Sequence, residues 1–146
     1  MKKYNLIPQE KNNFCVCSVL QSIFNKYDIS MSQKEISKNL TPTEKGFNID
    51  DKKIKNFLNN NGFLYTPYWK NETPFNEPEN VLEDIIKHDG FIGIKDHVYL
   101  VNYFNDPDII ITDPADISKI EKNLYSVRKE MEDSGNGYFC LIKKTK

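Results

Sequence analysis

The sequence has no long apolar run, no excess of charge of either sign and only two histidines. No stretch approaches the roughly 20 apolar residues of a membrane-spanning helix, so we expect no membrane span. The 20 basic and 21 acidic side chains give a net charge of −1, without the basic excess that is typical of nucleic-acid-binding proteins. Glycine-rich phosphate-binding loops are also missing. These absences argue against membrane and nucleic-acid partners.

Cysteines are few, and their spacing fits neither a disulfide framework nor a zinc site. The count of three is odd, and Cys15 and Cys17 are too close to pair comfortably within a helix. The sequence has no paired C-x-x-C motif with histidines at zinc-ligand spacing. The first residues contain two lysines but no apolar segment long enough for a signal peptide. We therefore expect free thiols, a cytoplasmic location, no metal and no other cofactor.

What is present suits one globular domain, residues 1–146, of the α+β class. The hydrophobic content of 38% and the charged content of 28% are typical of such a domain. Apolar periodicity and capping signals predict helices first and mainly strands afterwards, an order that favours an N-terminal helical layer packed on a C-terminal antiparallel sheet. The predicted helices cover residues 15–27, 33–40, 51–60, 80–87 and 117–131. The predicted strands cover residues 63–69, 91–94, 97–104, 108–112 and 138–142, and residues 70–79 form a surface connection.

The segment 15–27 has a helical period in which apolar side chains fill one arc. Cys17 lies at the edge of this arc, whereas Cys15 lies outside it beside Ser18 and Ser22. The pattern predicts that Cys17 is packed in the core and that Cys15 is accessible.

A cysteine at the first turn of a helix is a candidate nucleophile. The unpaired N–H groups and the dipole of a helix N-terminus lower a thiol pKa, and a neighbouring imidazole activates it further. Of the two histidines, His88 ends a predicted helix, which favours a structural role. His97 begins a strand, where a side chain can reach a site at the edge of the sheet. The alternative for His97 is a half-buried strand residue.

Two further residues complete a candidate catalytic set. Asp113 ends the strand after His97, and the lengths of the two strands predict that their ends meet, so that Asp113 can fix the imidazole tautomer. An Asp-Pro turn without a catalytic role is the alternative. Gln9 precedes Cys15 by six residues, and its amide N–H and the backbone N–H of Cys15 are candidate donors to an oxyanion.

The order of these motifs resembles the papain-like cysteine peptidases, and more narrowly the bacteriocin-processing (double-glycine leader) peptidases and their stand-alone relatives. The matching pieces are Ile7-Pro8-Gln9, the segment 15–20, His97-Val98-Tyr99-Leu100-Val101 and Ile111-Thr112-Asp113-Pro114. The resemblance implies a papain-like fold with Gln9 as oxyanion donor, Cys15 as nucleophile, His97 as base and Asp113 as orienting acid. Val16 departs from the family, which usually has glycine after the nucleophile.

The resemblance implies a cysteine peptidase that acts on a peptide or amide bond. Two alternatives share the fold: a thiol acyltransferase with an acyl substrate, and a non-catalytic module that binds a peptide. A redox pair of Cys15 and Cys17 is disfavoured, because residues two apart on a helix point about 200° away from each other. The sequence makes no prediction of the oligomeric state.

Overall fold

The computed structural model describes residues 4–44, 49–69 and 72–145. Along the described chain the elements are α1 (Cys15–Lys26), α2 (Gln33–Leu40), α3 (Asp51–Asn60), β1 (Phe63–Trp69), α4 (Thr73–Asn76), α5 (Pro78–Lys87), β2 (Asp89–Ile94), β3 (His97–Asn105), β4 (Asp108–Thr112), β5 (Lys119–Asn123), α6 (Leu124–Ser134) and β6 (Tyr138–Lys144).

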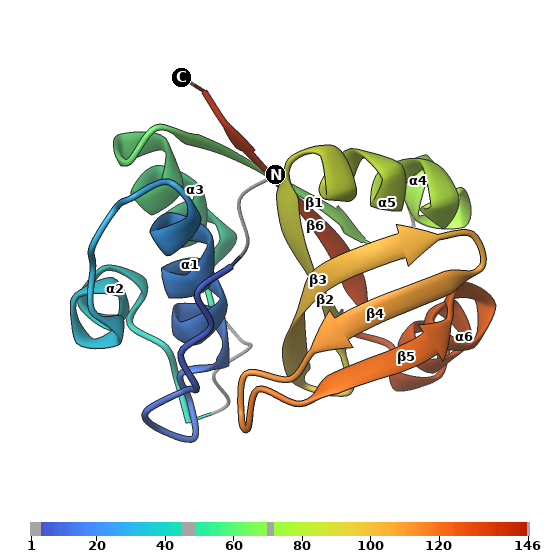
Figure 1. Cartoon of the computed structure of the whole chain (residues 1–146), viewed down its shortest axis with the longest axis horizontal. Coiled ribbons are helices and arrows are strands. Elements are labelled where there is room, and N and C mark those ends of the chain that lie inside the picture. The colour runs from blue at the N-terminus through green and yellow to red at the C-terminus, as the bar shows by residue number, and fades with distance from the viewer. Residues whose placement is uncertain (1–3, 45–48, 70–71, 146) are drawn as a thin grey trace.

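The strands form a six-stranded sheet in the order β1-β6-β2-β3-β4-β5, and all neighbouring strands are antiparallel. Helices α1, α2 and α3 pack on one face, and α4, α5 and α6 cover the other (Figure 1). Side chains of the central strands alternate between the two cores, so that Phe91 packs with the first group and Ile92 with the second. The predicted α+β class is confirmed. The second helical layer is an addition to the prediction.

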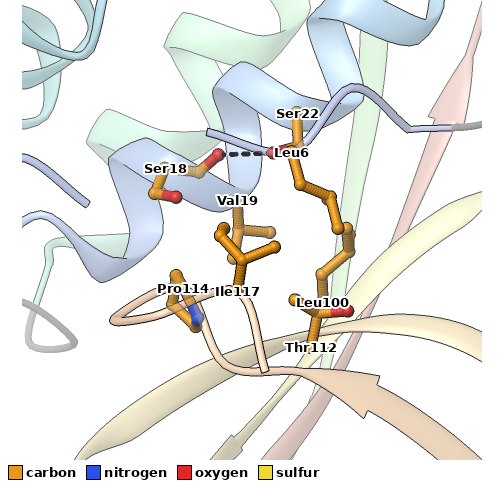
Figure 2. A pocket seen from close by; sticks show the side chains of 8 residues that line it. All are labelled: Leu6, Ser18, Val19, Ser22, Leu100, Thr112, Pro114 and Ile117. Atoms are coloured by element: carbon orange, nitrogen blue, oxygen red, sulfur yellow. Dashed lines mark hydrogen bonds between the residues drawn. The ribbon is translucent and has the colours of Figure 1, made fainter. Parts of the chain in front are cut away.

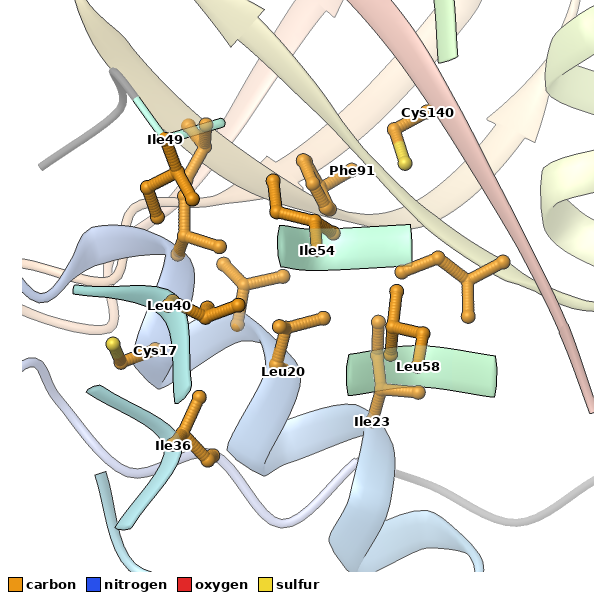
Figure 3. Close-up of a cluster of buried hydrophobic side chains, with 14 of the residues drawn as sticks. Cys17, Leu20, Ile23, Ile36, Leu40, Ile49, Ile54, Leu58, Phe91 and Cys140 are labelled. Atoms are coloured by element: carbon orange, nitrogen blue, oxygen red, sulfur yellow. The ribbon is translucent and has the colours of Figure 1, made fainter. Parts of the chain in front are cut away.

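Helix α1 is buried on nearly every side, because α2, α3, the sheet and the N-terminal arm surround it. Figure 3 shows its apolar side, with Cys17 and Leu20 among side chains from the other elements. Its serine side is also covered: the hydroxyl of Ser18 donates to the carbonyl of Ile7 at 2.6 Å. The prediction of an accessible Cys15 is therefore wrong, since this residue is only 2% exposed. Periodicity located the apolar core but not the arm that buries the polar side.

The end of the sheet corrects the fifth predicted helix. Residues 119–123 form strand β5, and α6 begins only at Leu124, capped by Asn123, whose side chain accepts from the N–H of Tyr125 at 2.9 Å. Ile120 satisfies the helical spacing but pairs with Ile111 in the sheet, because tertiary pairing outweighs a weak helical pattern. Part of the connection predicted over 70–79 forms the short helix α4, while residues 70–71 lie outside the described residues.

A tight hairpin leads directly into His97. Lys95 and Asp96 connect β2 to β3, with φ angles of 49° and 67°. Positive φ at both central residues matches the type I′ turn, whose twist suits a two-residue hairpin. The carboxylate of Asp96 accepts a hydrogen bond from the side-chain amide of Asn136, which ties this turn to the segment before β6. The hairpin thereby fixes the start of β3.

Candidate active site

Cys15 occupies the first turn of α1, where two opposing effects act on its thiol. Burial is the larger effect and raises the pKa of Cys15 above its ordinary value. The backbone N–H groups of Val98 and Val16 act in the other direction, while the negative charge of Asp113 raises the pKa further. The N–H groups at the helix start lower the pKa of Cys15 as expected, but loss of hydration outweighs them and the net shift is upward.

His97 and Asp113 meet at the same end of the sheet. The imidazole Nε2 lies 2.7 Å from the Oδ1 of Asp113, and the two side chains are 24% and 23% exposed. The register explains this contact. Leu100 pairs with Thr112, so His97, which precedes Leu100 on β3, and Asp113, which directly follows Thr112, lie at the same end of the two strands. The same Oδ1 accepts from the backbone N–H of Ala115 at 2.9 Å. The predicted proximity of His97 and Asp113 is observed, while their catalytic roles stay a prediction.

The thiol belongs to the same region as this pair. One of the backbone N–H groups that lower the pKa of the Cys15 thiol comes from Val98, the residue after His97, and the negative charge of Asp113 also acts on the thiol. Helix α1 packs against β3 on the first core, where Cys15 and Val98 are both members. The start of the helix therefore faces the start of the histidine strand.

Gln9 lies at the start of the turn that leads to Cys15, and its side-chain amide already donates hydrogen bonds within this turn. Its Nε2 donates to the carbonyls of Lys11 at 3.0 Å and Asn12 at 3.2 Å. Its Oε1 is buried and has no hydrogen-bond partner among the described residues. Its backbone N–H donates to the carbonyl of Pro114 at 2.7 Å, which links Gln9 to the residue after Asp113. An oxyanion role requires the amide to exchange a loop carbonyl for the substrate oxygen.

The space between α1 and the loop after β4 is narrow. A cavity of about 10 Å³, enough for roughly one water molecule, lies there. Figure 2 shows Ser18, Val19 and Ser22 of α1 on one side of it, and Pro114 and Ile117 of the loop on the other. Pro114 directly follows Asp113 in the sequence, but Cys15, His97 and Asp113 are not among the residues that line this cavity.

His88 lies away from this group, as its predicted structural role requires. It follows the last residue of α5, and its carbonyl accepts from the Nζ of Lys26 at 3.1 Å. The neighbouring Asp89 is fully buried and accepts from Lys26 at 2.8 Å and from Tyr4 and Tyr27 at 2.5 Å each. This cluster was not predicted from the sequence. Its one signal was a carboxylate at the start of an otherwise apolar strand.

The order of the elements and the antiparallel sheet define the papain-like fold. Three solved structures share the fold. A double glycine motif protease from an AMS/PCAT transporter, in complex with the leader peptide, has a TM-score of 0.70 and 18% identity over 99% of this chain and 94% of that chain. The peptidase domain of Streptococcus ComA, a bi-functional ABC transporter, has a TM-score of 0.70 and 17% identity, covering 96% and 98%. The same domain from Streptococcus mutans with a small-molecule inhibitor gives 0.57 and 14%, covering 95% and 98%.

The family assignment is narrower than the fold. The model of the Peptidase C39 family matches residues 3–146, and the chain belongs to that family. No curated protein sequence was found to match the chain. Among the residues that the structure describes, none of the helices combines the length and the apolar character needed to cross a membrane.

Proposed function

We propose that this protein is a cysteine peptidase in which Cys15 is the nucleophile, His97 the general base, Asp113 the orienting acid and Gln9 an oxyanion donor. The observation that carries the proposal is the 2.7 Å contact between His97 and Asp113 at the sheet edge facing the start of α1. Membership of a peptidase family supports the same reaction class.

In this proposal the two imidazole nitrogens of His97 have different roles, and the contact with Asp113 supports the assignment. Because Nε2 faces a carboxylate oxygen, the neutral ring carries its proton on Nε2. This N–H donates a hydrogen bond to the carboxylate of Asp113. Nδ1 is then the unprotonated nitrogen that accepts the thiol proton of Cys15. Since burial raises the pKa of Cys15, the thiol gives up this proton during attack on the substrate rather than beforehand.

The reaction then follows the acyl-enzyme route. The sulfur of Cys15 forms a bond to the substrate carbonyl carbon, and the carbonyl oxygen becomes an oxyanion that the backbone N–H of Cys15 and the amide of Gln9 stabilise. The C–N bond breaks as His97 returns its proton to the leaving amine. Water next attacks the thioester and loses a proton to His97, and the acid product leaves as the free thiol re-forms.

The substrate in this proposal is a peptide with small residues before the cleaved bond. One of the fold relatives is a double glycine motif protease bound to a leader peptide. Cys15 is only 2% exposed, so a substrate without bulky side chains at these positions can reach its thiol with the least displacement of the surrounding residues. The cytoplasmic location and the single domain over residues 1–146 stay predictions from the sequence.

The test uses two peptide libraries that differ only at the two positions before a fixed bond, Gly-Gly in one and Leu-Leu in the other. The parent should cleave the Gly-Gly library and carry a thioester adduct detectable by intact mass. Cys15→Ala should lose both signals, whereas Cys17→Ala, which removes a thiol from the same helix, should retain them. Absence of cleavage by the parent in both libraries would overturn the proposal.

A second candidate function is a papain-like module that binds peptides without cleaving them. The burial of Cys15 and the engagement of the Gln9 amide by Lys11 and Asn12 favour it, because both features oppose attack on a carbonyl. In this case the parent and Cys15→Ala should bind the Gly-Gly library with equal affinity, and neither should release product.

A further inference from the structure

Gln33 is a fully buried polar residue at the first position of α2, far from Gln9 in the sequence but beside it in space. Its Oε1 accepts from the backbone N–H of Glu10 at 2.9 Å, and its Nε2 donates to the carbonyl of Pro8 at 2.9 Å. Pro8 and Glu10 are the two residues that flank Gln9. The side-chain amide of Gln33 therefore bonds the backbone on both sides of Gln9, as a neighbouring strand would.

The clamp is also fixed to α1. The Nε2 of Gln33 donates to the Oε1 of Gln21 at 2.9 Å, and Gln21 belongs to the helix that begins with Cys15. Buried polar groups are costly unless they are bonded, so a fully buried amide with three partners holds its geometry firmly. Gln33 thus sets the position of the Gln9 backbone relative to the helix that carries the thiol.

The opposite side of Gln9 is fixed by a separate bond. The backbone N–H of Gln9 donates to the carbonyl of Pro114 at 2.7 Å. The backbone of Gln9 is thereby held between Gln33 on one side and the loop after Asp113 on the other. Its side chain is less well satisfied, since Oε1 is buried without a partner among the described residues. A fixed backbone with an adjustable amide suits a donor that must turn toward an oxyanion.

We propose that Gln33 is a positioning residue for the oxyanion donor Gln9, which it places through the backbone of Pro8 and Glu10. This inference rests on the proposed peptidase function. Gln33 does not touch substrate in this proposal. Its effect appears only in the step in which the carbonyl oxygen becomes negative.

The kinetic test compares two reactions of the same thiol. Cleavage of a peptide requires the oxyanion donors, whereas alkylation of Cys15 by iodoacetamide does not. Gln33→Met should lower kcat by about 10²–10³-fold, as expected for loss of one oxyanion donor, and should change the alkylation rate by less than about twofold. Gln9→Ala should give a similar loss of kcat, and the double variant should lose no more than Gln9→Ala alone.

Ile36→Val is the matched control, because Ile36 is fully buried in the same helix but takes no part in the clamp. It should retain the kcat of the parent. Gln33→Glu keeps the acceptor for Glu10 and loses the donor to Pro8, so an intermediate kcat is expected. If Gln33→Met and the parent have equal kcat while Gln9→Ala is impaired, the positioning role is wrong and the peptidase function stands. If the parent cleaves nothing, both are wrong.

Amide hydrogen exchange tests the clamp without any substrate. The N–H of Glu10 should be protected in the parent and should exchange at least about tenfold faster in Gln33→Met, while the amides of α1 keep their protection. Unchanged exchange at Glu10 in this variant would overturn the clamp, whatever the variant does to peptide cleavage.

Discussion

At the level of single residues, two opposing effects set the pKa of the candidate nucleophile Cys15: loss of hydration and hydrogen bonding to backbone N–H groups. The first turn of α1 supplies N–H donors to Cys15, and Val98 supplies one more from the sheet. These donors favour a thiolate, but burial favours the neutral thiol more strongly. Proton transfer to His97 is consequently part of the proposed chemical step.

We expect this competition to be visible in the reactivity of Cys15. Because its pKa lies above the ordinary value of 9.0, iodoacetamide should label the resting protein slowly at pH 7, and the rate should rise only as the pH passes 9. The pH dependence of labelling, followed by peptide mass mapping, measures this directly. A labelling rate at Cys15 that is already at its maximum below pH 8 would contradict the raised pKa.

The carboxylate of Asp113 should matter for turnover because it orients the imidazole of His97. Asp113→Asn keeps the size of the side chain but favours the wrong tautomer, and kcat/KM should fall by about 10²–10⁴-fold. Asp116→Asn, in the same loop and without contact to His97, is the control and should retain activity. Equal kcat/KM for the two variants would remove Asp113 from the proposed mechanism.

At the scale of the element, a buried ionic cluster joins the N-terminal arm, the end of α1 and the start of β2. Asp89 accepts hydrogen bonds from Tyr4 of the arm and from Lys26 and Tyr27 at the end of the helix. The side chain of Lys26 is only 12% exposed and that of Asp89 is fully buried, so water cannot replace either partner in solvating the other charge. The same arm continues to Gln9, so the cluster anchors one end of the segment that reaches the site.

Removal of Asp89 should therefore destabilise the fold strongly. Asp89→Ala leaves the Lys26 charge buried without its partner, and the free energy of unfolding should fall by about 3–5 kcal/mol. Urea unfolding of the variant measures the change. Glu83→Ala, on the exposed side of α5, should change the stability by no more than about 0.5 kcal/mol. A similar, small change in both variants would show that the cluster contributes little.

At the scale of the whole molecule, one sheet separates two apolar cores, and free thiols lie in the first of them. Cys17 is the clearest example, since burial raises its pKa to about 12 from an ordinary value of 9.0. The unfolded chain ionises this thiol above pH 9, whereas the folded protein keeps it neutral until about pH 12. The stabilising contribution is complete below pH 9 and is lost as the pH rises toward 12.

The free energy of unfolding should accordingly decrease between pH 9 and pH 12, by about 1.4 kcal/mol per pH unit for each such thiol. Urea unfolding at several pH values would show the slope. Cys17→Val keeps an apolar side chain at this position and should reduce the slope by the contribution of one thiol, about 1.4 kcal/mol per pH unit. An identical slope in the parent and in this variant would mean that Cys17 ionises without cost in the folded state.

The elements that could be predicted from the sequence are those marked by local patterns, such as caps and apolar periodicity. Helix α2 begins where its sequence predicts, and the side chain of Ser32 caps it by accepting from the backbone N–H of Glu35 at 3.1 Å. Strands β3, which begins at His97, and β4, which ends just before Asp113, were predicted with nearly their observed bounds, and their lengths alone indicated that the two side chains meet. Strand β5 was missed because Ile117 and Ile120 also fit a helical spacing, and only pairing with β4 decides between the two.

The class of fold, the helix that begins at Cys15 and the meeting of His97 with Asp113 are all predictable from the sequence, because periodicity, caps and strand lengths are properties of short segments. Three features follow only from the packing of the folded chain: Cys15 is buried, Asp89 is paired with Lys26, and Gln33 clamps the backbone around Gln9. These features depend on which segments, distant in the sequence, pack together and exclude water. Hydration of a side chain is therefore set by the whole packed molecule, whereas helical spacing is a property of one segment.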